Sequence, residues 1–256
     1  MDDPQITVLG SATPYPRPDN ACSGFLVTGA GTRLWLDAGP GTLAQLQRHA
    51  RPDEIDAVWI SHLHADHCAD LLPAYYALLF ADLSPAAPIP LYGPPGIADR
   101  LAAFLTNGPR RSPVESAFEV HELRDGHEVR VGGLTLHSRA VDHGMPAYAV
   151  RIGAAGRSLV YSGDTAPCAA LDSLARACDL LVCEADSDTV PAGEPPVHHT
   201  PEEAGATAAR AGATRLLLTH VGPAIAPDRA VARAASAFPG PVAYAEPGGT
   251  YPVVPG

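Results

Sequence analysis

The chain has 256 residues, of which 46% are hydrophobic and 18% are charged, and its formal net charge is −11. This composition is typical of a soluble globular protein. Proteins that bind a long nucleic acid usually present a basic face to the phosphate backbone, so such a partner is disfavoured. The longest apolar stretch, Leu71 to Ala81, is interrupted by Pro73 and is too short to cross a bilayer, so we expect no membrane partner.

The chain start and the cysteines carry expectations about the compartment. The first residues, MDDPQITVLG, are acidic and lack the basic region and apolar core of a signal peptide. The five cysteines are odd in number and scattered, without a CxxC pair, which fits a reducing environment. We therefore expect a cytoplasmic protein. Glycine and proline are spread along the chain instead of gathering in a linker, so we expect residues 1–256 to form one domain.

Short apolar runs followed by turns predict buried strands. In chain order they are Ile6–Gly10, Arg33–Gly39 and Ala57–His62, and then the runs that end at His143, Asp164, Asp186 and His220. Helix-like segments lie between them, at Gly41–Ala50, Ala69–Ala81, Ala98–Thr106, Ala169–Ala177, Pro201–Ala211 and Asp228–Ala237. Thr200 is the expected N-cap of the helix that begins at Pro201, with acidic residues in its first turn. The alternation of strands and helices predicts an α/β architecture.

A cluster of candidate metal ligands follows the third predicted strand. The stretch SHLHADH contains the pattern HxHxDH, formed by His62, His64, Asp66 and His67. Imidazole and carboxylate groups suit Zn²⁺, and four of them are too many to bury without partners. On an irregular turn, His62 and His64 can face one metal while Asp66 and His67 face a second. Two metals need more ligands, and three further candidates stand at strand ends, namely His143, Asp164 and His220.

These groups predict a hydrolytic mechanism. A water shared by two metals has its pKa lowered toward about 7 and supplies hydroxide, which attacks the substrate. Asp66 is expected to orient that hydroxide as well as to bind metal. The departing oxygen needs a proton, which a free histidine beside the site would donate. The candidates are His198 and His199 in the stretch PVHHT, together with Glu184, which ends the strand LLVCE.

The pattern HLHADH, followed by DH, SGDT and LTH, resembles the metallo-β-lactamase superfamily. Within it, the chain is most similar to the ribonuclease Z-like branch and to small actinobacterial-type cyclic-nucleotide phosphodiesterases. The resemblance implies an αββα sandwich of two mixed β-sheets flanked by helices. It also implies two divalent metal ions, expected to be Zn²⁺ with Mn²⁺ or Fe²⁺ as alternatives, and a homodimer.

The resemblance assigns the ligands to two ions. It implies a first ion held by His62, His64 and His143. It implies a second ion held by Asp66, His67 and His220, with the carboxylate of Asp164 bridging both.

The leading hypothesis is a phosphodiesterase that acts on a small anionic substrate, a 3′,5′-cyclic nucleotide such as cyclic AMP or cyclic GMP. Ribonuclease Z is the first alternative, but the arm that clamps tRNA in that enzyme is inserted where this chain has only two strands and a turn, between His143 and Asp164. A lactonase, a thioesterase or a β-lactamase-like hydrolase is the second alternative, because acyl and phosphoryl chemistry share the scaffold. Glu184 with His198 favours phosphodiester cleavage. A non-enzymatic binding protein is disfavoured, because every ligand position is filled.

Two points stay open in the sequence. His198 and His199 both satisfy the spacing of the proton donor. We favour His198 as the donor, oriented by Glu184, and expect His199 to be a solvent-facing neighbour. Tyr75, Tyr76 and Phe80 follow the metal motif at near-helical spacing and offer a wall for stacking a base, but helix packing on the sheet explains them as well and is favoured.

Overall fold

The computed structural model describes residues 3–83, 85–190 and 193–254. Within these ranges no helix is both long and apolar enough to cross a membrane. The expected domain span of 1–256 includes residues outside these ranges and stays a prediction.

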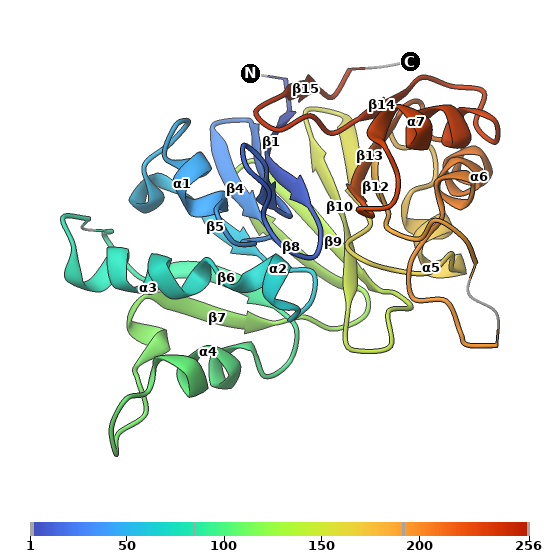
Figure 1. Ribbon diagram of the computed structural model, residues 1–256. Coiled ribbons are helices and arrows are strands. Elements are labelled where there is room, and N and C mark those ends of the chain that lie inside the picture. Colours follow the sequence, from blue (N-terminus) through green and yellow to red (C-terminus); the bar gives the residue numbers. More distant parts are fainter. Residues whose placement is uncertain (1–2, 84, 191–192, 255–256) are drawn as a thin grey trace.

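Two mixed β-sheets form the centre of the protein (Figure 1). The first sheet is eight-stranded in the order β15-β1-β3-β4-β5-β6-β7, with the short β2 also paired to β1. Its strands are β1 (Gln5–Ala12), β2 (Ala21–Cys22), β3 (Gly24–Gly29), β4 (Thr32–Leu36), β5 (Ala57–Trp59), β6 (Ile89–Gly93), β7 (Phe118–Glu122) and β15 (Thr250–Pro252). The pairs from β4 to β7 are parallel, whereas β1, β3 and β4 pair in antiparallel fashion.

The second sheet is seven-stranded in the order β14-β13-β12-β11-β10-β9-β8. Its strands are β8 (His127–Val131), β9 (Leu134–Ala140), β10 (Tyr148–Ala154), β11 (Arg157–Tyr161), β12 (Leu180–Ala185), β13 (Leu216–Val221) and β14 (Val242–Tyr244). The pairs from β8 to β11 are antiparallel and those from β11 to β14 are parallel. Parallel strands present their carboxyl ends at one edge of a sheet, where the predicted ligands follow them.

The strands are apolar on both faces because each sheet is covered on both sides. In β4, Leu34 and Leu36 point into the core between the sheets, while Trp35 points outward to the helices. This is the alternation that a strand imposes on successive side chains. Figure 1 shows α1, α3 and α4 over the first sheet and α5, α6 and α7 over the second. The protein is therefore the expected αββα sandwich.

Each of the helix-like segments overlaps a helix. The helices are α1 (Thr42–Leu46), α2 (Ala65–Cys68), α3 (Leu71–Phe80), α4 (Ile97–Leu105), α5 (Ala169–Leu174), α6 (Pro201–Ala211) and α7 (Pro227–Ala235), with 3₁₀ turns η1 (Pro52–Glu54) and η2 (Val114–Ser116). The bounds of α6 match the prediction, because Thr200 caps it: its side chain accepts a hydrogen bond from the amide of Glu203, and Glu203 reaches back to the amide of Thr200. The short α2 was not expected, since the sequence indicates an irregular turn there.

Several strands end earlier than the sequence indicates. The run Ala57–His62 contains β5, which ends at Trp59, because the amide of Ser61 donates to Oδ1 of Asp37 instead of to a strand (2.7 Å). Strands β9 and β11 likewise end before His143 and Asp164. Most of the predicted ligands therefore lie in loops just beyond strands, where the backbone is free to aim several side chains at one point.

Candidate metal centre

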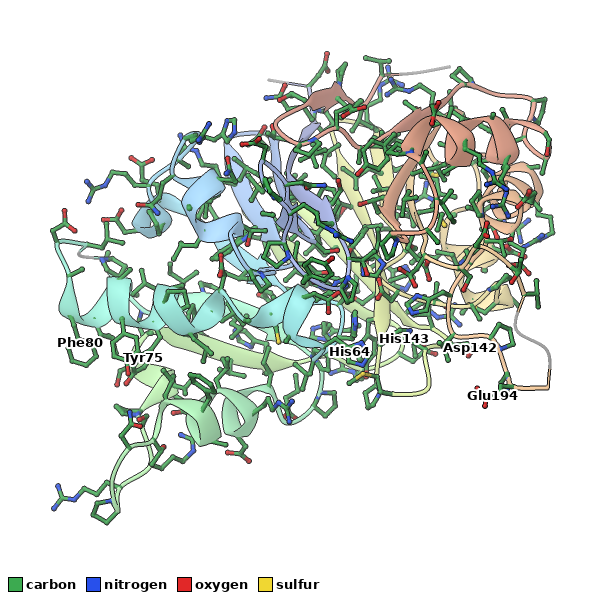
Figure 2. All side chains as sticks on the ribbon, in the orientation of Figure 1. His64, Tyr75, Phe80, Asp142, His143 and Glu194 are labelled. Carbon is green, nitrogen blue, oxygen red and sulfur yellow. The ribbon has the colours of Figure 1, made fainter. Side chains whose placement is uncertain are left out.

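The predicted ligands meet at one edge of the sandwich. His62, His64, Asp66 and His67 follow β5 or lie in α2, while His143, Asp164 and His220 come from the second sheet. Figure 2 shows His64 beside His143, which are far apart in the sequence. Their potential ligand atoms fall into two groups in which all atoms lie within 4.8 Å of one another.

The first group gathers three imidazoles around one point. Nδ1 of His64 lies 3.0 Å from Nε2 of His62 and 3.2 Å from Nε2 of His143. Oδ2 of Asp164 lies 3.7 Å from Nε2 of His62 and 4.0 Å from that of His143.

The second group contains Asp66, His67 and His220. Oδ2 of Asp66 lies 3.3 Å from Nε2 of His220 and 3.9 Å from Nε2 of His67. Oδ2 of Asp164 is again close, at 3.4 Å from Nε2 of His220 and 3.3 Å from Nε2 of His67. The same carboxylate oxygen therefore faces both groups, as a bridging ligand would.

These distances fit metal ions. Tetrahedral zinc with Zn–N bonds of about 2.0–2.1 Å places its ligand atoms roughly 3.4 Å apart. Nε2 of His67 is buried and has no hydrogen-bond partner among the described residues. Buried polar atoms normally have one, and metal coordination at this cluster would supply the missing partner. The cluster can hold metal ions, as expected for the dimetal site of this fold.

The other ring nitrogens fix the orientation of three imidazoles. Nδ1 of His62 donates to Oγ of Ser61 at 3.0 Å, and Nδ1 of His143 donates to the carbonyl of Val197 at 2.9 Å. Nδ1 of His67 donates to Oδ2 of Asp37 at 2.7 Å. A neutral histidine that donates from Nδ1 has an unprotonated Nε2, which is the form that binds metal.

Asp37 is a functional residue that the sequence reasoning missed. It is fully buried, and its carboxylate also accepts hydrogen bonds from Oγ of Ser61 and from the hydroxyl of Tyr161, both at 2.7 Å. Its backbone has φ of 55°, which is uncommon for a residue other than glycine. The sequence signal was an aspartate at the end of the predicted strand RLWLDAG, the same placement that identified other candidates.

Burial and neighbouring charge act differently across the cluster. Burial acts to lower the pKa of His67, but the carboxylates of Asp164 and Asp37 outweigh it and raise that pKa, whereas His62 and Asp164 are shifted toward the protonation states that metal ligands need. Burial lowers the pKa of His62 well below its usual range, and the neighbouring His67 adds to this effect. Burial acts to raise the pKa of Asp164, but the adjacent His220 and His67 outweigh it and hold the pKa well below its usual range. His62 is therefore neutral and Asp164 anionic at neutral pH.

The backbone is shaped to bring the groups together. His220 has φ of 48°, and the β12–β13 register shifts at this residue, since Glu184 pairs with Thr219 and Ala185 with Val221. Such a bulge redirects one side chain, here the His220 imidazole, and the unusual φ is strain stored at the site. Gly39 lies against the backbone of α2, where an added Cβ would come within 2.0 Å of the carbonyl oxygen of Asp66. Only glycine fits at this close approach.

His198 and Glu184 form a pair beside the cluster. Glu184 is fully buried, and its Oε1 accepts a hydrogen bond from Nδ1 of His198 at 3.0 Å. Backbone amides of Thr165, His199 and Asp186 also donate to this carboxylate, at 2.9–3.2 Å. Burial opposes the imidazolium of His198, but the hydrogen bond and charge of Glu184 outweigh it and raise the pKa of His198 to about 9.

The expectation that His199 faces solvent is wrong. Its side chain is fully buried, and its Nδ1 donates to the carbonyl of Thr165 at 2.6 Å. Nε2 lies 3.1 Å from Oγ1 of Thr207 in α6. His199 therefore ties α6 to the loop that carries Asp164. The two adjacent histidines point in different directions, and of the two only His198 lines the pocket.

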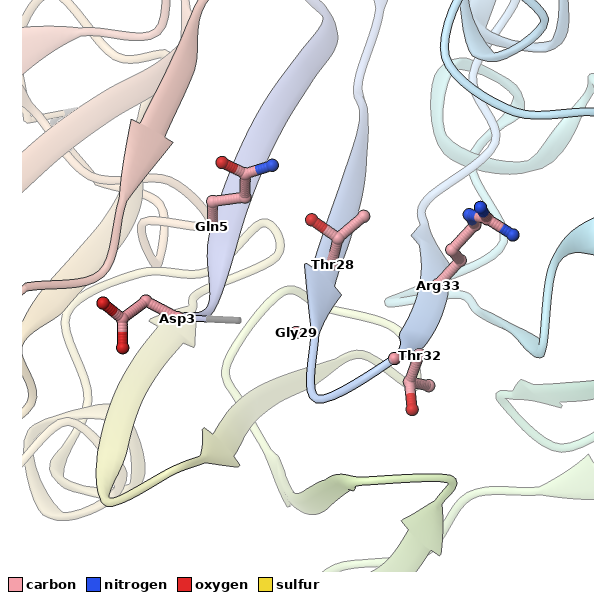
Figure 3. Close-up of a pocket in the computed structure, with 7 residues that line it drawn as sticks. Asp3, Gln5, Thr28, Gly29, Thr32 and Arg33 are labelled. Carbon is pink, nitrogen blue, oxygen red and sulfur yellow. The ribbon is translucent and has the colours of Figure 1, made fainter. Parts of the chain in front are cut away.

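An open pocket of about 560 Å³ gives access to the cluster, lined among others by Thr13, Asp66, Asp164, His198 and His220. A second cavity, also of about 560 Å³, lies at the opposite end of the first sheet (Figure 3). It contacts Gln5 at the start of β1, whereas Thr13, just past the end of β1, lines the metal pocket. None of the residues that line the second cavity belongs to the cluster.

The stretch of aromatic residues after the metal motif does not form a wall of the pocket. Tyr75 is buried in the core beneath α3, and its ring contacts those of Tyr76 and Phe80. Figure 2 shows Tyr75 and Phe80 well away from His64, because α3 runs away from the cluster. Packing against the sheet accounts for Tyr75, as expected from the sequence, whereas Tyr76 and Phe80 are 48% and 70% exposed.

Comparisons with known proteins agree with this geometry. The family model described as "Beta-lactamase superfamily domain" matches residues 32–221, and the chain belongs to this family. The chain is thus a metal-dependent hydrolase of the metallo-β-lactamase fold.

Three similar proteins indicate to which branch of the superfamily the chain is related. An uncharacterized protein of Mycobacterium tuberculosis is 39% identical over 241 residues, covering 93% of this chain and 88% of that protein. Ribonuclease Z of Mycobacterium sp. (strain KMS) is 32% identical over 259 residues, covering 92% of this chain and 91% of that protein. The crystal structure of the metallo-beta-lactamase fold protein YhfI from Bacillus subtilis superposes with a TM-score of 0.85 at 27% identity, covering 98% of this chain and 99% of that chain. The resemblance to ribonuclease Z-like proteins is therefore confirmed.

Proposed function

We propose that the protein is a binuclear phosphodiesterase that hydrolyses a small phosphodiester, and that its substrate is a 3′,5′-cyclic nucleotide. The observation that carries the proposal is His198, a pocket histidine held by the buried Glu184 beside two groups of candidate metal ligands. Cleavage of a phosphodiester requires both a site for the anionic phosphate and a proton for the departing oxygen. This arrangement supplies both.

The ligand roles are part of the proposal. The first divalent ion would be held by His62, His64 and His143, and the second by Asp66, His67 and His220, with Asp164 facing both groups. When bound, such ions supply Lewis-acid activation of water and charge stabilisation at the phosphate.

The residues around the ions complete the reaction. Asp66 lines the pocket and would orient the attacking water by accepting a hydrogen bond from it. The phosphorus–oxygen ester bond breaks as the water oxygen bonds to phosphorus. A ring nitrogen of His198 lies within 4.8 Å of ligand atoms of Asp164 and His220, so its proton is near the departing oxygen. Glu184 keeps the imidazole oriented through Nδ1 and favours its protonated form.

Two observations favour a small substrate over precursor tRNA. Residues 144–163, all of them described, contain only β10, β11, a tight turn and the loops at either end, which leaves no room for an RNA-clamping arm. The net charge of −11 also opposes a polyanion. The relatives named ribonuclease Z still support phosphodiester chemistry, because a ribonuclease cleaves phosphodiester bonds.

The proposal is tested with the purified, metal-loaded protein. Hydrolysis of cyclic AMP, cyclic GMP, bis(p-nitrophenyl) phosphate, a lactone and precursor tRNA is measured side by side. We expect turnover of the cyclic nucleotides and of the synthetic phosphodiester. Turnover of the lactone alone would indicate acyl chemistry on this scaffold, and absence of hydrolysis of any phosphodiester would refute the proposal.

A further inference from the structure

An apolar cavity of about 180 Å³ adjoins the metal pocket. It lies between α2, the start of α3 and α4, and its lining includes Leu63, Ala65, Leu72, Leu101, Arg100 and Phe104. Ala65 lines this cavity and the metal pocket alike, and it directly follows His64, a candidate ligand. A compact substrate bound at the metals therefore has an apolar space within reach.

Phe104 is the exposed aromatic surface of this cavity. It stands at the end of α4 and is 72% exposed, whereas its neighbour Leu101 is buried in the core. In the part of the chain that the structure describes, the Phe104 ring stacks on no other ring, whereas Phe80, 70% exposed on α3, contacts Tyr75 and Tyr76. One face of the Phe104 ring is thus available to a flat ligand.

Arg100 places a free cation at the same cavity. Its guanidinium makes no hydrogen bond or ion pair with any described residue. The adjacent Asp99 does not neutralise it, because Asp99 pairs with Arg111 at 3.2 Å. A guanidinium donates well to the ring nitrogen and carbonyl acceptors on the edge of a purine.

We propose that this cavity binds the base of the nucleotide substrate, with Phe104 as the stacking surface and Arg100 as a donor to the edge of the base. The inference rests on the proposed function, because the phosphate must lie at the metals. A base is flat and apolar on its faces and polar at its edge, and the cavity offers the matching surfaces. A polar cavity of about 120 Å³ on the other side of the pocket is less suitable, because its Ser11, Asn20 and Tyr244 already bond one another.

The test compares Phe104→Ala with Phe80→Ala, a matched loss of one exposed phenyl group on a neighbouring helix. Each variant is assayed with cyclic AMP and with the 3′,5′-cyclic phosphate of 1-O-methylribose, which has no base. We expect Phe104→Ala to lower kcat/KM for cyclic AMP by about 5- to 100-fold, the range of base–aromatic stacking. The base-free substrate should change by less than about twofold in this variant, and Phe80→Ala should leave both substrates unchanged.

Equal losses on both substrates, or no loss on either, would overturn the inference. A change from dimer to monomer in Phe104→Ala, measured by light scattering and with unchanged kcat/KM, would also overturn it. Phe104 would then lie in a contact between two copies of the chain. Calorimetric binding of cyclic AMP separates the two proposals. If the wild-type protein binds cyclic AMP through Phe104 but does not hydrolyse it, only the proposed function is refuted. If Phe104→Ala hydrolyses cyclic AMP as well as the wild type does, only the base site is refuted. A protein that does neither refutes both.

Discussion

Truncation of His198 isolates its role as proton donor. In His198→Ala the imidazole is lost, but Glu184 keeps three backbone amide donors, from Thr165, His199 and Asp186. The bond that is lost joins a protonated imidazole to a buried carboxylate, so the fold should lose about 1.5–3 kcal/mol, although the three amides still pair with Glu184. General acid catalysis contributes about 10²- to 10⁴-fold. We therefore expect a loss of that size in kcat for cyclic AMP, together with a moderate loss of stability that leaves the protein folded.

The leaving group makes this prediction specific. p-Nitrophenolate departs without protonation, so kcat for bis(p-nitrophenyl) phosphate should fall by less than about tenfold in the same variant. Both substrates are assayed with wild type and His198→Ala, and metal content is measured on the same samples to show that the ions are retained. Equal losses on the two substrates, or loss of metal, would refute the role of proton donor and indicate that His198 acts on the metals or on substrate binding.

Three further variants test the surrounding residues. Glu184→Gln should reduce turnover of cyclic AMP while keeping metal, and full activity would show that the imidazole needs no orientation by Glu184. Asp37→Asn removes an acceptor shared by Ser61, His67 and Tyr161. The affinity of the protein for metal, measured by competition with a chelator, should therefore fall by about 10- to 100-fold. An unchanged affinity would contradict the role of Asp37 in orienting His67. His199→Ala should lower the free energy of unfolding in urea by about 2–4 kcal/mol, because it leaves a cavity and unpaired polar groups; undiminished stability with lost turnover would make His199 a catalytic residue instead.

The sequence predicted which side chains meet in the cluster because the pattern that marks them is local. Four candidate ligands stand within one short motif, and three others follow apolar runs, so strand periodicity and residue type were sufficient to find them. The same reasoning extended the strands too far. Whether a backbone amide pairs with a strand or with a side chain such as that of Asp37 depends on tertiary contacts.

The residues that the sequence analysis missed or misplaced depend on distant partners. Asp37 contacts His67 and Tyr161, which are 30 and 124 positions away, so its place at a strand end marks it as a candidate but does not reveal its role. The orientation of His199 is likewise fixed by Thr165 and by a residue of α6. Only the packing of this segment decides which of the two adjacent histidines is buried.

The amount of metal bound per chain tests the binuclear site most directly. The protein is dialysed against excess Zn²⁺, freed of unbound metal and analysed by elemental mass spectrometry. The two groups of ligands that share Asp164 predict two equivalents per chain. In Asp164→Ala, which removes the shared oxygen, the content should fall to about one equivalent or less. A wild-type protein that binds one equivalent or none would contradict the binuclear site on which the proposed function depends.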